Sequence, residues 1–273
     1  MTSIIPPTPV RPVSWVARAL RLPDLWSRIL LLGACLAAWE AAVSVFAIPE
    51  LLLPPPSRIG AALFSDLTSL RLLRHAGVTL TEVLGGFALG AGAGLALGCL
   101  LGRFDWLWRL SYPYVVAFET VPKVAIAPLI VVWFGFGVNS KIVTSALICF
   151  FPVVANTLSG LRTTPPELVE MMTTFKASTG QIFAKVRMPH AMPYVFAGLE
   201  IGIVMAVIGA IVGEFVGAQA GLGFMILQRQ FAMDIAGVFS ILAILSAFGI
   251  VLNVAIRRLQ YTLVFWLPRS GHG

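Results

Sequence analysis

The sequence predicts an all-α membrane protein with about six transmembrane helices, and two observations carry this prediction. Apolar residues make up 58% of the 273 residues and charged residues only 11%, about half the charged fraction of an ordinary soluble domain. The charged residues also gather in short blocks between apolar runs that are long enough to cross a bilayer. Lipid is therefore expected around most of the chain, which argues against a free cytosolic enzyme, a disordered chain and a repeat solenoid.

Six apolar runs reach the roughly 20 residues that a helix needs to cross the hydrocarbon layer. They cover residues 29–48, 77–101, 112–137, 140–160, 194–218 and 237–256. Between the first two runs, a cluster of prolines is followed by apolar residues at helical spacing. This pattern predicts an extended stretch and then a helix that lies along the outer surface of the membrane.

Basic residues are distributed unequally between the two sides of these spans. With the N-terminus inside, the inner segments hold 13 of the 19 Lys and Arg residues and the outer segments hold five, Lys141 among them, while Lys123 lies within a span. The positive-inside rule then predicts that both termini are cytoplasmic, and the net charge of +7 needs no nucleic-acid partner. The expected organisation is an arm over 1–28 with an interfacial helix near 14–28, a transmembrane domain over 29–260 and a tail over 261–273.

Glycines recur every fourth residue along the second run, which places them on one face of a helix. They are Gly86, Gly90, Gly94, Gly98 and Gly102. Small residues at this spacing favour close packing of another helix in a groove, and the alternative is a strip of backbone that lines a pore. No G-x-x-x-x-G-K-[ST] motif occurs in the chain, so any ATPase that drives this protein must be another subunit.

The long inner segment 162–193 predicts two short amphipathic helices. Thr164 with Glu167 three residues later predicts a capping box at the start of the first helix, and Ser178 with Gln181 predicts another at the start of the second. A turn is expected between them, near Lys176 and Ala177.

Pro189 and Pro193 are expected to end the second of these helices before the fifth span begins. Such a tethered helix pair can dock into a groove of a soluble partner. A simple connector on the inner leaflet is the alternative, although a connector needs only a few residues.

This segment resembles the EAA loop of binding-protein-dependent ABC importer permeases, whose pattern is E-A-A-x3-G-x9-I-x-L-P. Glu170 and Pro189 match in identity and spacing, whereas Lys176 stands at the glycine position. The stretches LLLPPPSRI, VPKVAIAPLIVVWFGFGVNSKI and IGAIVGEFVGAQAGLGFMI resemble the nitrate/sulfonate/taurine branch, including members for thiamine precursors. By this resemblance the ATPase-coupling residues are Glu170, Met171, Met172, Lys176, Ala177, Ser178, Val186 and Pro189.

The resemblance implies the type I ABC importer permease (MetI-like) fold in a prokaryotic inner membrane. It implies a second permease copy, a periplasmic or lipoprotein solute-binding protein outside and ABC ATPase subunits inside. ATP and Mg would be bound by those ATPases, so this chain would be no enzyme and would carry no cofactor. The solute would be nitrate-, sulfonate- or taurine-like, or a pyrimidine thiamine precursor.

Ionisable residues within the spans are expected to have a structural partner or a function, because a charge at mid-bilayer costs at least about 2.5–3.5 kcal/mol. Glu119 and Lys123 are spaced as an ion pair on a helix, and Glu200 and Glu214 are nearly four turns apart and so share a face. These four residues are candidates for the translocation path, and pairing between or within helices is the structural alternative, which also applies to Glu40.

Glu82 is expected to reach the membrane interface. No spacing of His, Cys, Asp or Glu predicts a metal site or a catalytic cluster. An ion-coupled secondary transporter or channel is the alternative function, and an intramembrane enzyme is the third.

Overall fold

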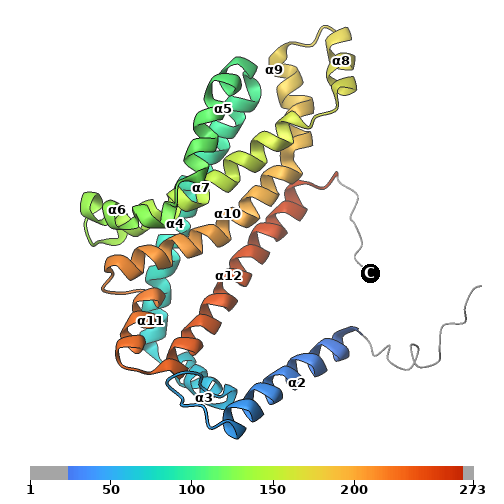
Figure 1. Cartoon of the computed structure of the whole chain (residues 1–273). Helices are drawn as coiled ribbons and strands as arrows, with labels where there is room; N and C mark the ends of the chain where they lie inside the picture. Colours follow the sequence, from blue (N-terminus) through green and yellow to red (C-terminus); the bar gives the residue numbers. More distant parts are fainter. Residues whose placement is uncertain (1–23, 267–273) are drawn as a thin grey trace, which may run out of the picture.

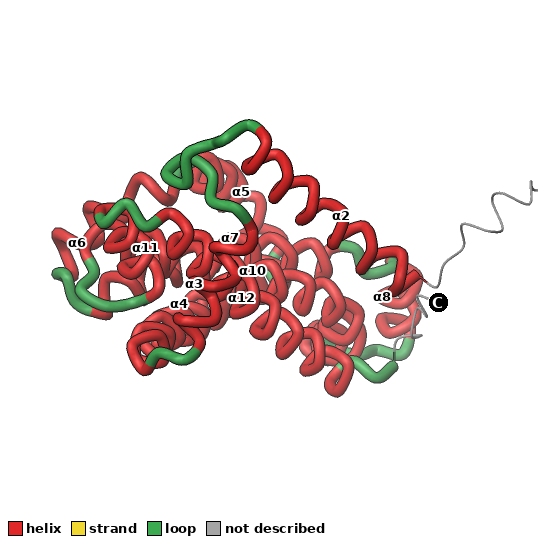
Figure 2. The backbone as a smooth tube through the Cα atoms, turned by 90° about the horizontal axis from the view of Figure 1, so that it is seen from below, coloured by secondary structure: helices red, strands yellow, loops and turns green. Residues whose placement is uncertain are grey.

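The computed structural model describes residues 24–266, apart from the side chains of residues 24, 25, 116 and 119, and over this range the chain forms helices and no strand (Figures 1 and 2). The expected arm and tail therefore fall largely outside the described residues. The elements in order are α2 (Asp24–Val45), α3 (Pro56–Leu67), α4 (Leu70–Arg103), α5 (Asp105–Thr120), η1 (Lys123–Ile126), α6 (Ala127–Phe134), α7 (Val138–Arg162), α8 (Pro166–Thr174), α9 (Thr179–Ile182), η2 (Phe183–Arg187), α10 (Met188–Gly217), α11 (Leu222–Phe231) and α12 (Ile235–Leu263).

Five helices in the described part of the chain are long and apolar enough to cross a membrane. They are Trp26–Val45, Leu70–Arg103, Val138–Arg162, Thr179–Gly217 and Ile235–Leu263. The all-α membrane class is thus confirmed, and each of these helices contains most of one predicted span.

The prediction of a single helix over 112–137 is wrong. The helix α5 ends at Thr120, a 3-10 turn covers Lys123–Ile126, and α6 contains only eight residues. The cause is local: the ring of Pro122 disfavours the helical conformation of the residue before it, and Val121 is extended with ψ 129°. The third crossing is therefore a broken one.

The core is α7 packed between α4 and α10 (Figure 1). The glycines of α4 face α7: a methyl group on Gly90 would overlap the carbonyl oxygen of Ala146, and one on Gly98 would lie 2.8 Å from Cβ of Thr157. Contacts advance along both helices in the same direction, from Gly86 against Ser145 to Gly102 against Leu161, so α4 and α7 are parallel.

Glycines of α10 form the second contact face of α7. A Cβ on Gly198 would lie 2.8 Å from Cβ of Asn156, and a Cβ on Gly209 would lie 2.6 Å from Cα of Ser145. Residue numbers thus increase along α10 in the direction in which they decrease along α7, so this pair is antiparallel. Small residues on both neighbours let the backbone of α7 be approached from two sides, which is how helices associate closely in lipid.

Helix α3, predicted after the proline cluster, is present, and Glu40 of α2 holds its first turn. The Glu40 carboxylate accepts hydrogen bonds from the N–H of Ser57 at 3.0 Å and from its Oγ at 2.7 Å. The structural interpretation of Glu40, a bond to another helix, is thereby confirmed. Figure 1 shows α2 diverging from the rest of the bundle beyond this contact.

Gly90→Ala is expected to destabilise the protein, because its methyl group must push α4 away from the backbone of Ala146. The expected loss is about 1–3 kcal/mol, as for other overpacked contacts. It is measured as a fall in the thermal unfolding midpoint of the detergent-purified chain. Gly92→Ala is the matched control, because a methyl group there meets nothing within 4 Å. An equal fall in both variants would contradict the close packing of α4 on α7.

Candidate functional site

Residues 162–193 lie at the end of the bundle where α7 ends and α10 begins, which we call the loop end. Helix α8 begins at Pro166 with Pro165 as its N-cap, so the predicted capping box of Thr164 and Glu167 is wrong. The hydroxyl of Thr164 instead donates to the carbonyl oxygen of Leu161 at 3.1 Å, at the end of α7. A threonine hydroxyl that bonds back to the preceding turn cannot cap the next helix.

The turn after α8 is centred on Lys176, as predicted. Lys176 has a left-handed backbone with φ 58°. Its N–H donates to the carbonyl of Thr173 at 2.8 Å, and the N–H of Ala177 donates to that of Met172 at 3.0 Å. This pair of bonds is the Schellman motif, which ends a helix with one left-handed residue, most often glycine.

The second helix begins as the sequence predicts and ends differently. The capping box of Ser178 and Gln181 is confirmed, with both reciprocal hydrogen bonds present. The prediction that Pro189 and Pro193 end this helix is wrong, because the chain continues through the π-helical turn η2 into α10. In that wider turn the N–H of Met188 reaches the carbonyl of Phe183, which relieves the clash that a proline ring makes one turn back.

Two arginines join residues 162–193, which we call the loop segment, to the end of α4. Arg187 of η2 donates to the carbonyl of Gly102 at 3.4 Å, and Arg103 of α4 donates to the carbonyl of Thr179 at 3.2 Å. The Arg103 guanidinium also lies 5.5 Å from the ring centroid of Phe183. The loop segment is thus held by α4 as well as by α7 and α10, which precede and follow it in the chain.

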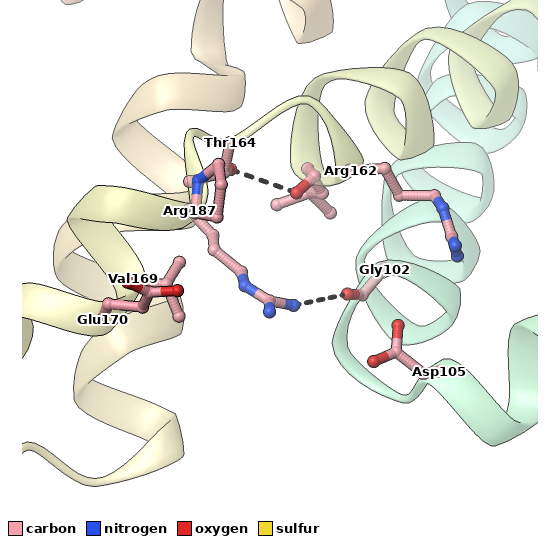
Figure 3. A pocket seen from close by; sticks show the side chains of 9 residues that line it. Gly102, Asp105, Arg162, Thr164, Val169, Glu170 and Arg187 are labelled. Carbon is pink, nitrogen blue, oxygen red and sulfur yellow. Dashed lines mark hydrogen bonds between the residues drawn. The ribbon is translucent and has the colours of Figure 1, made fainter. Parts of the chain in front are cut away.

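A cavity of about 300 Å³ lies beside these contacts (Figure 3). Figure 3 shows Val169 and Glu170 of α8 on one side of it and Arg162 and Asp105 on the other, with Arg187 reaching across to Gly102. The sequence did not predict the contacts of Arg103 and Arg187. The available signal was the position of both arginines beside helix ends, on the side of the predicted spans that is rich in Lys and Arg.

The predicted coupling residues of α8 and the following turn are mostly accessible. Glu170, Met171, Lys176 and Ser178 are exposed, and Met172 and Ala177 are half-buried. Val186 and Pro189 are also half-buried, where η2 meets α10. The structure therefore brings an exposed edge, Glu170 to Ser178, together on the outside of the helix pair.

At the opposite end of the bundle, Glu214 of α10 fixes the start of α11. Its buried carboxylate accepts the N–H groups of Gly223 and Phe224 and the hydroxyl of Thr79, the last at 2.6 Å. Thr79 accepts the N–H of Leu222 at 2.8 Å, and His75 accepts that of Gly221 at 3.0 Å; these four N–H groups open α11. Such groups have no partner within their own helix, so side chains of α4 and α10 satisfy them.

Lys141 and Glu82 are buried beside this cluster, and the burial of Glu82 is contrary to the expectation that it reaches the membrane interface. The Lys141 ammonium donates to the carbonyls of Phe136 and Gly217 at 2.6 and 2.7 Å. It interacts electrostatically with both carboxyls, Glu82 and Glu214. A buried cation therefore accompanies two buried acids, and close packing of α4, α7 and α10 brings the three together.

The remaining path candidates lie elsewhere. Glu200 accepts a hydrogen bond from Arg257 of α12 at 3.1 Å, so the acids Glu200 and Glu214 meet different neighbours along α10. The helix that would align Glu119 with Lys123 is interrupted after Thr120. The Lys123 ammonium lies 4.5 Å from the ring centroid of Phe151 on α7.

The family model for the binding-protein-dependent transport system inner membrane component matches residues 86–266, which include the loop segment and all of α7, α10 and α12. The chain belongs to this family. It is a multi-pass inner-membrane permease of the ABC importer class.

Curated relatives of this permease cover nearly the whole chain. The riboflavin transport system permease protein RibX of Chloroflexus aurantiacus is 35% identical over 97% of this chain and 99% of its own length. The formylaminopyrimidine transport permease protein ThiX of Halalkalibacterium halodurans is 35% identical over 85% and 92%. The putative aliphatic sulfonates transport permease protein SsuC of Bacillus subtilis is 31% identical over 88% of each.

The fold of this permease is similar to that in inward-facing structures of the MetNI methionine ABC transporter. One matching chain has a TM-score of 0.55 and 21% identity, with 77% of this chain and 98% of that chain covered. The MetI-like fold predicted from the EAA-type segment is thus confirmed.

Lys176→Gly is expected to stabilise the turn of the permease by about 1 kcal/mol, because a left-handed backbone is strained for a residue with a Cβ and not for glycine. Hydrogen exchange at the amides of Lys176 and Ala177, which make the Schellman bonds, should slow about fivefold. Lys185→Gly is the control, since Lys185 lies in the π-helical turn and glycine should speed exchange there. Faster exchange in Lys176→Gly would contradict the turn.

Lys141→Met is expected to destabilise the permease by about 3 kcal/mol, because it leaves Glu82 and Glu214 buried without their cation. The double variant with Glu82→Gln should recover part of this loss by removing one buried acid. Both are compared by thermal unfolding with Arg71→Met, an exposed arginine of α4. If Glu82→Gln lowers the midpoint further, Lys141 does not balance these carboxyls.

Proposed function

We propose that this permease forms the path by which a small solute, delivered by an external binding protein, enters the cell with energy from ABC ATPase subunits. The exposed edge from Glu170 to Ser178 carries this proposal. A helix pair that presents acidic, apolar and basic side chains on one accessible edge suits a groove on a soluble partner. ATP and Mg would be bound by that partner, so this chain contributes movement and not hydrolysis.

The contacts at the loop end support mechanical coupling. The loop segment continues into α10 without a break, follows α7 directly and is joined to α4 through Arg187 and Arg103. A displacement of α8 by closing ATPases therefore acts on the three helices of the core at once. Rotation of these helices would open the path alternately to each side.

The orientation follows from the charges. Arg103, Arg162 and Arg187 lie at the loop end, which the positive-inside rule assigns to the cytoplasm, so both termini are proposed to be cytoplasmic. The proposed assembly contains two copies of this chain. A second copy would cover apolar side chains that α6 leaves exposed, such as Val132 and Trp133, and the path would lie between the copies.

The proposed solute belongs to the classes that the relatives name. Those at 35% identity are named for ring compounds, riboflavin and formylaminopyrimidine, while relatives at 31% and 27% are named for sulfonates and taurine. A pyrimidine-type or flavin-type solute is therefore favoured over a sulfonate, and the external binding protein would make the first selection.

Glu170→Ala is expected to weaken association with the cognate ATPase at least tenfold, because it removes the carboxylate at the start of the exposed edge. Co-purification of the tagged permease with its candidate ATPases measures this loss. Glu167→Ala is the matched control, an exposed acid one turn earlier on α8, and it should retain association.

Deletion of 176–178 should abolish the association altogether. Full association of Glu170→Ala and of the deletion, together with solute uptake that needs no ATP, would reject coupling to an ATPase. That result would favour an ion-coupled transporter or a channel.

A further inference from the structure

The start of α11 is held by side chains of other helices, and one of these side chains, His75 of α4, can change its charge. The N–H of Gly221 donates to Nδ1 of His75 at 3.0 Å, and we call this hydrogen bond the His75 contact. Gly221 is buried and has φ 123°, a backbone conformation that favours glycine. Because this N–H is buried, it depends on the imidazole as its acceptor.

The ring of His75 is also oriented by a second contact with α11. It is stacked on the ring of Phe224, with the centroids 6.0 Å apart and the planes inclined by 22°. One turn further along α4, the hydroxyl of Thr79 accepts the N–H of Leu222 at 2.8 Å. Successive turns of α4 thus supply acceptors for successive N–H groups of α11, and the imidazole cannot turn away without losing the stacking contact.

An imidazole nitrogen accepts a hydrogen bond only while it carries no proton. In the neutral ring with its proton on Nε2, Nδ1 has a free lone pair, whereas in the imidazolium both nitrogens are donors. Protonation of His75 would therefore turn a ring N–H toward the N–H of Gly221. It would also place a positive charge at the N-terminus of α11, where the helix dipole is already positive.

Charged groups of several helices surround this ring. On its own helix, Arg71 and Arg74 lie within the preceding turn and interact with it electrostatically. The acid at the start of α11 is Glu214 of α10, whose carboxylate already accepts three hydrogen bonds. The other charged groups of this end are Glu82 of α4, Lys141 of α7, Arg229 of α11, Asp66 of α3 and Asp234 before α12. An imidazolium would thus meet like charge on α4 and an acid that is already engaged.

We propose that His75 is a proton-binding site that controls the attachment of α11 to α4. The neutral ring makes the His75 contact, and the protonated ring breaks it, so the contact is present above the titration range of the histidine and lost below it. Histidine ordinarily titrates near pH 6.5, within the physiological range. The ring is half-buried, so protons of the medium can reach it.

The site lies at the end of the bundle opposite α8 and α9 (Figure 1). Under the orientation proposed above, on which only this step rests, the medium at that end is external. Helix α11 packs on both α10 and α12. Acid outside the cell would therefore loosen the link between α4 and these two helices at the outer end.

Hydrogen exchange of the full chain in lipid nanodiscs, compared at pH 5 and pH 8, tests this inference. Each exchange rate is divided by the intrinsic rate at the same pH, so that protection factors are compared. The amide of Gly221 should be about tenfold less protected at pH 5 than at pH 8, the effect of one lost hydrogen bond.

His75→Asn is the main variant, because its carboxamide oxygen stands where Nδ1 stands and does not titrate. Protection of Gly221 should then be the same at both pH values. His75→Leu removes the acceptor and should give low protection at both. His190→Asn is the matched control: it changes the other histidine of the described residues, at the opposite end in α10, and should keep the pH dependence of the unmodified chain.

Three results would overturn the inference. They are equal protection at pH 5 and pH 8 in the unmodified chain, an unchanged pH dependence in His75→Asn, and full protection of Gly221 at pH 8 in His75→Leu. The second would assign the pH dependence to the buried acids Glu82 and Glu214, and the third applies even where His75→Asn does not fold. Both faces of a nanodisc meet the same buffer and no transport is measured, so these outcomes are separate from the test of import with Glu170→Ala.

Discussion

The fold depends on the close approach of α7 to its two neighbours. In lipid there is no hydrophobic driving force for helix association, so van der Waals contact between closely packed helices must supply the attraction. On one side of α7, Gly90 leaves no space for a methyl group against Ala146, and on the other Gly209 leaves none against Ser145. These contacts make α4, α7 and α10 a single unit, and the residues at both ends of the bundle are positioned by it.

The consequence is that the two ends are connected by rigid helices. At the loop end, Arg103 and Arg187 bind the loop segment to α4. At the opposite end, Glu214 of α10 caps α11 and lies in the field of Lys141 from α7. A shift of α10 relative to α4 would thus disturb buried charges at one end and the loop contacts at the other, so intermediate arrangements are costly and two discrete states are favoured.

The sequence predicted the features that depend on spacing alone. The glycine repeat and the capping box of Ser178 and Gln181 are local patterns, and the structure contains both as contacts. The errors arose where a second interaction competes. Thr164 bonds back to α7 instead of capping α8, and a π-helical turn admits Pro189 into a continuous helix. The burial of Lys141 could not be predicted either, because it follows from three helices that meet only in the folded bundle.

The two membrane lysines differ in a way that only the folded chain reveals. The Lys141 ammonium is fully enclosed, with two backbone carbonyls as close partners and two acids nearby, so its charge is used to hold helices together. Lys123 is half-buried at a broken helix and lines a cavity whose other described walls are aromatic or aliphatic. Each of these charges has an energetic cost in the bilayer. For Lys141 the cost is offset by the carbonyl and carboxyl groups that pack around it. For Lys123 the cost is offset in part by the face of the Phe151 ring, over which the ammonium lies.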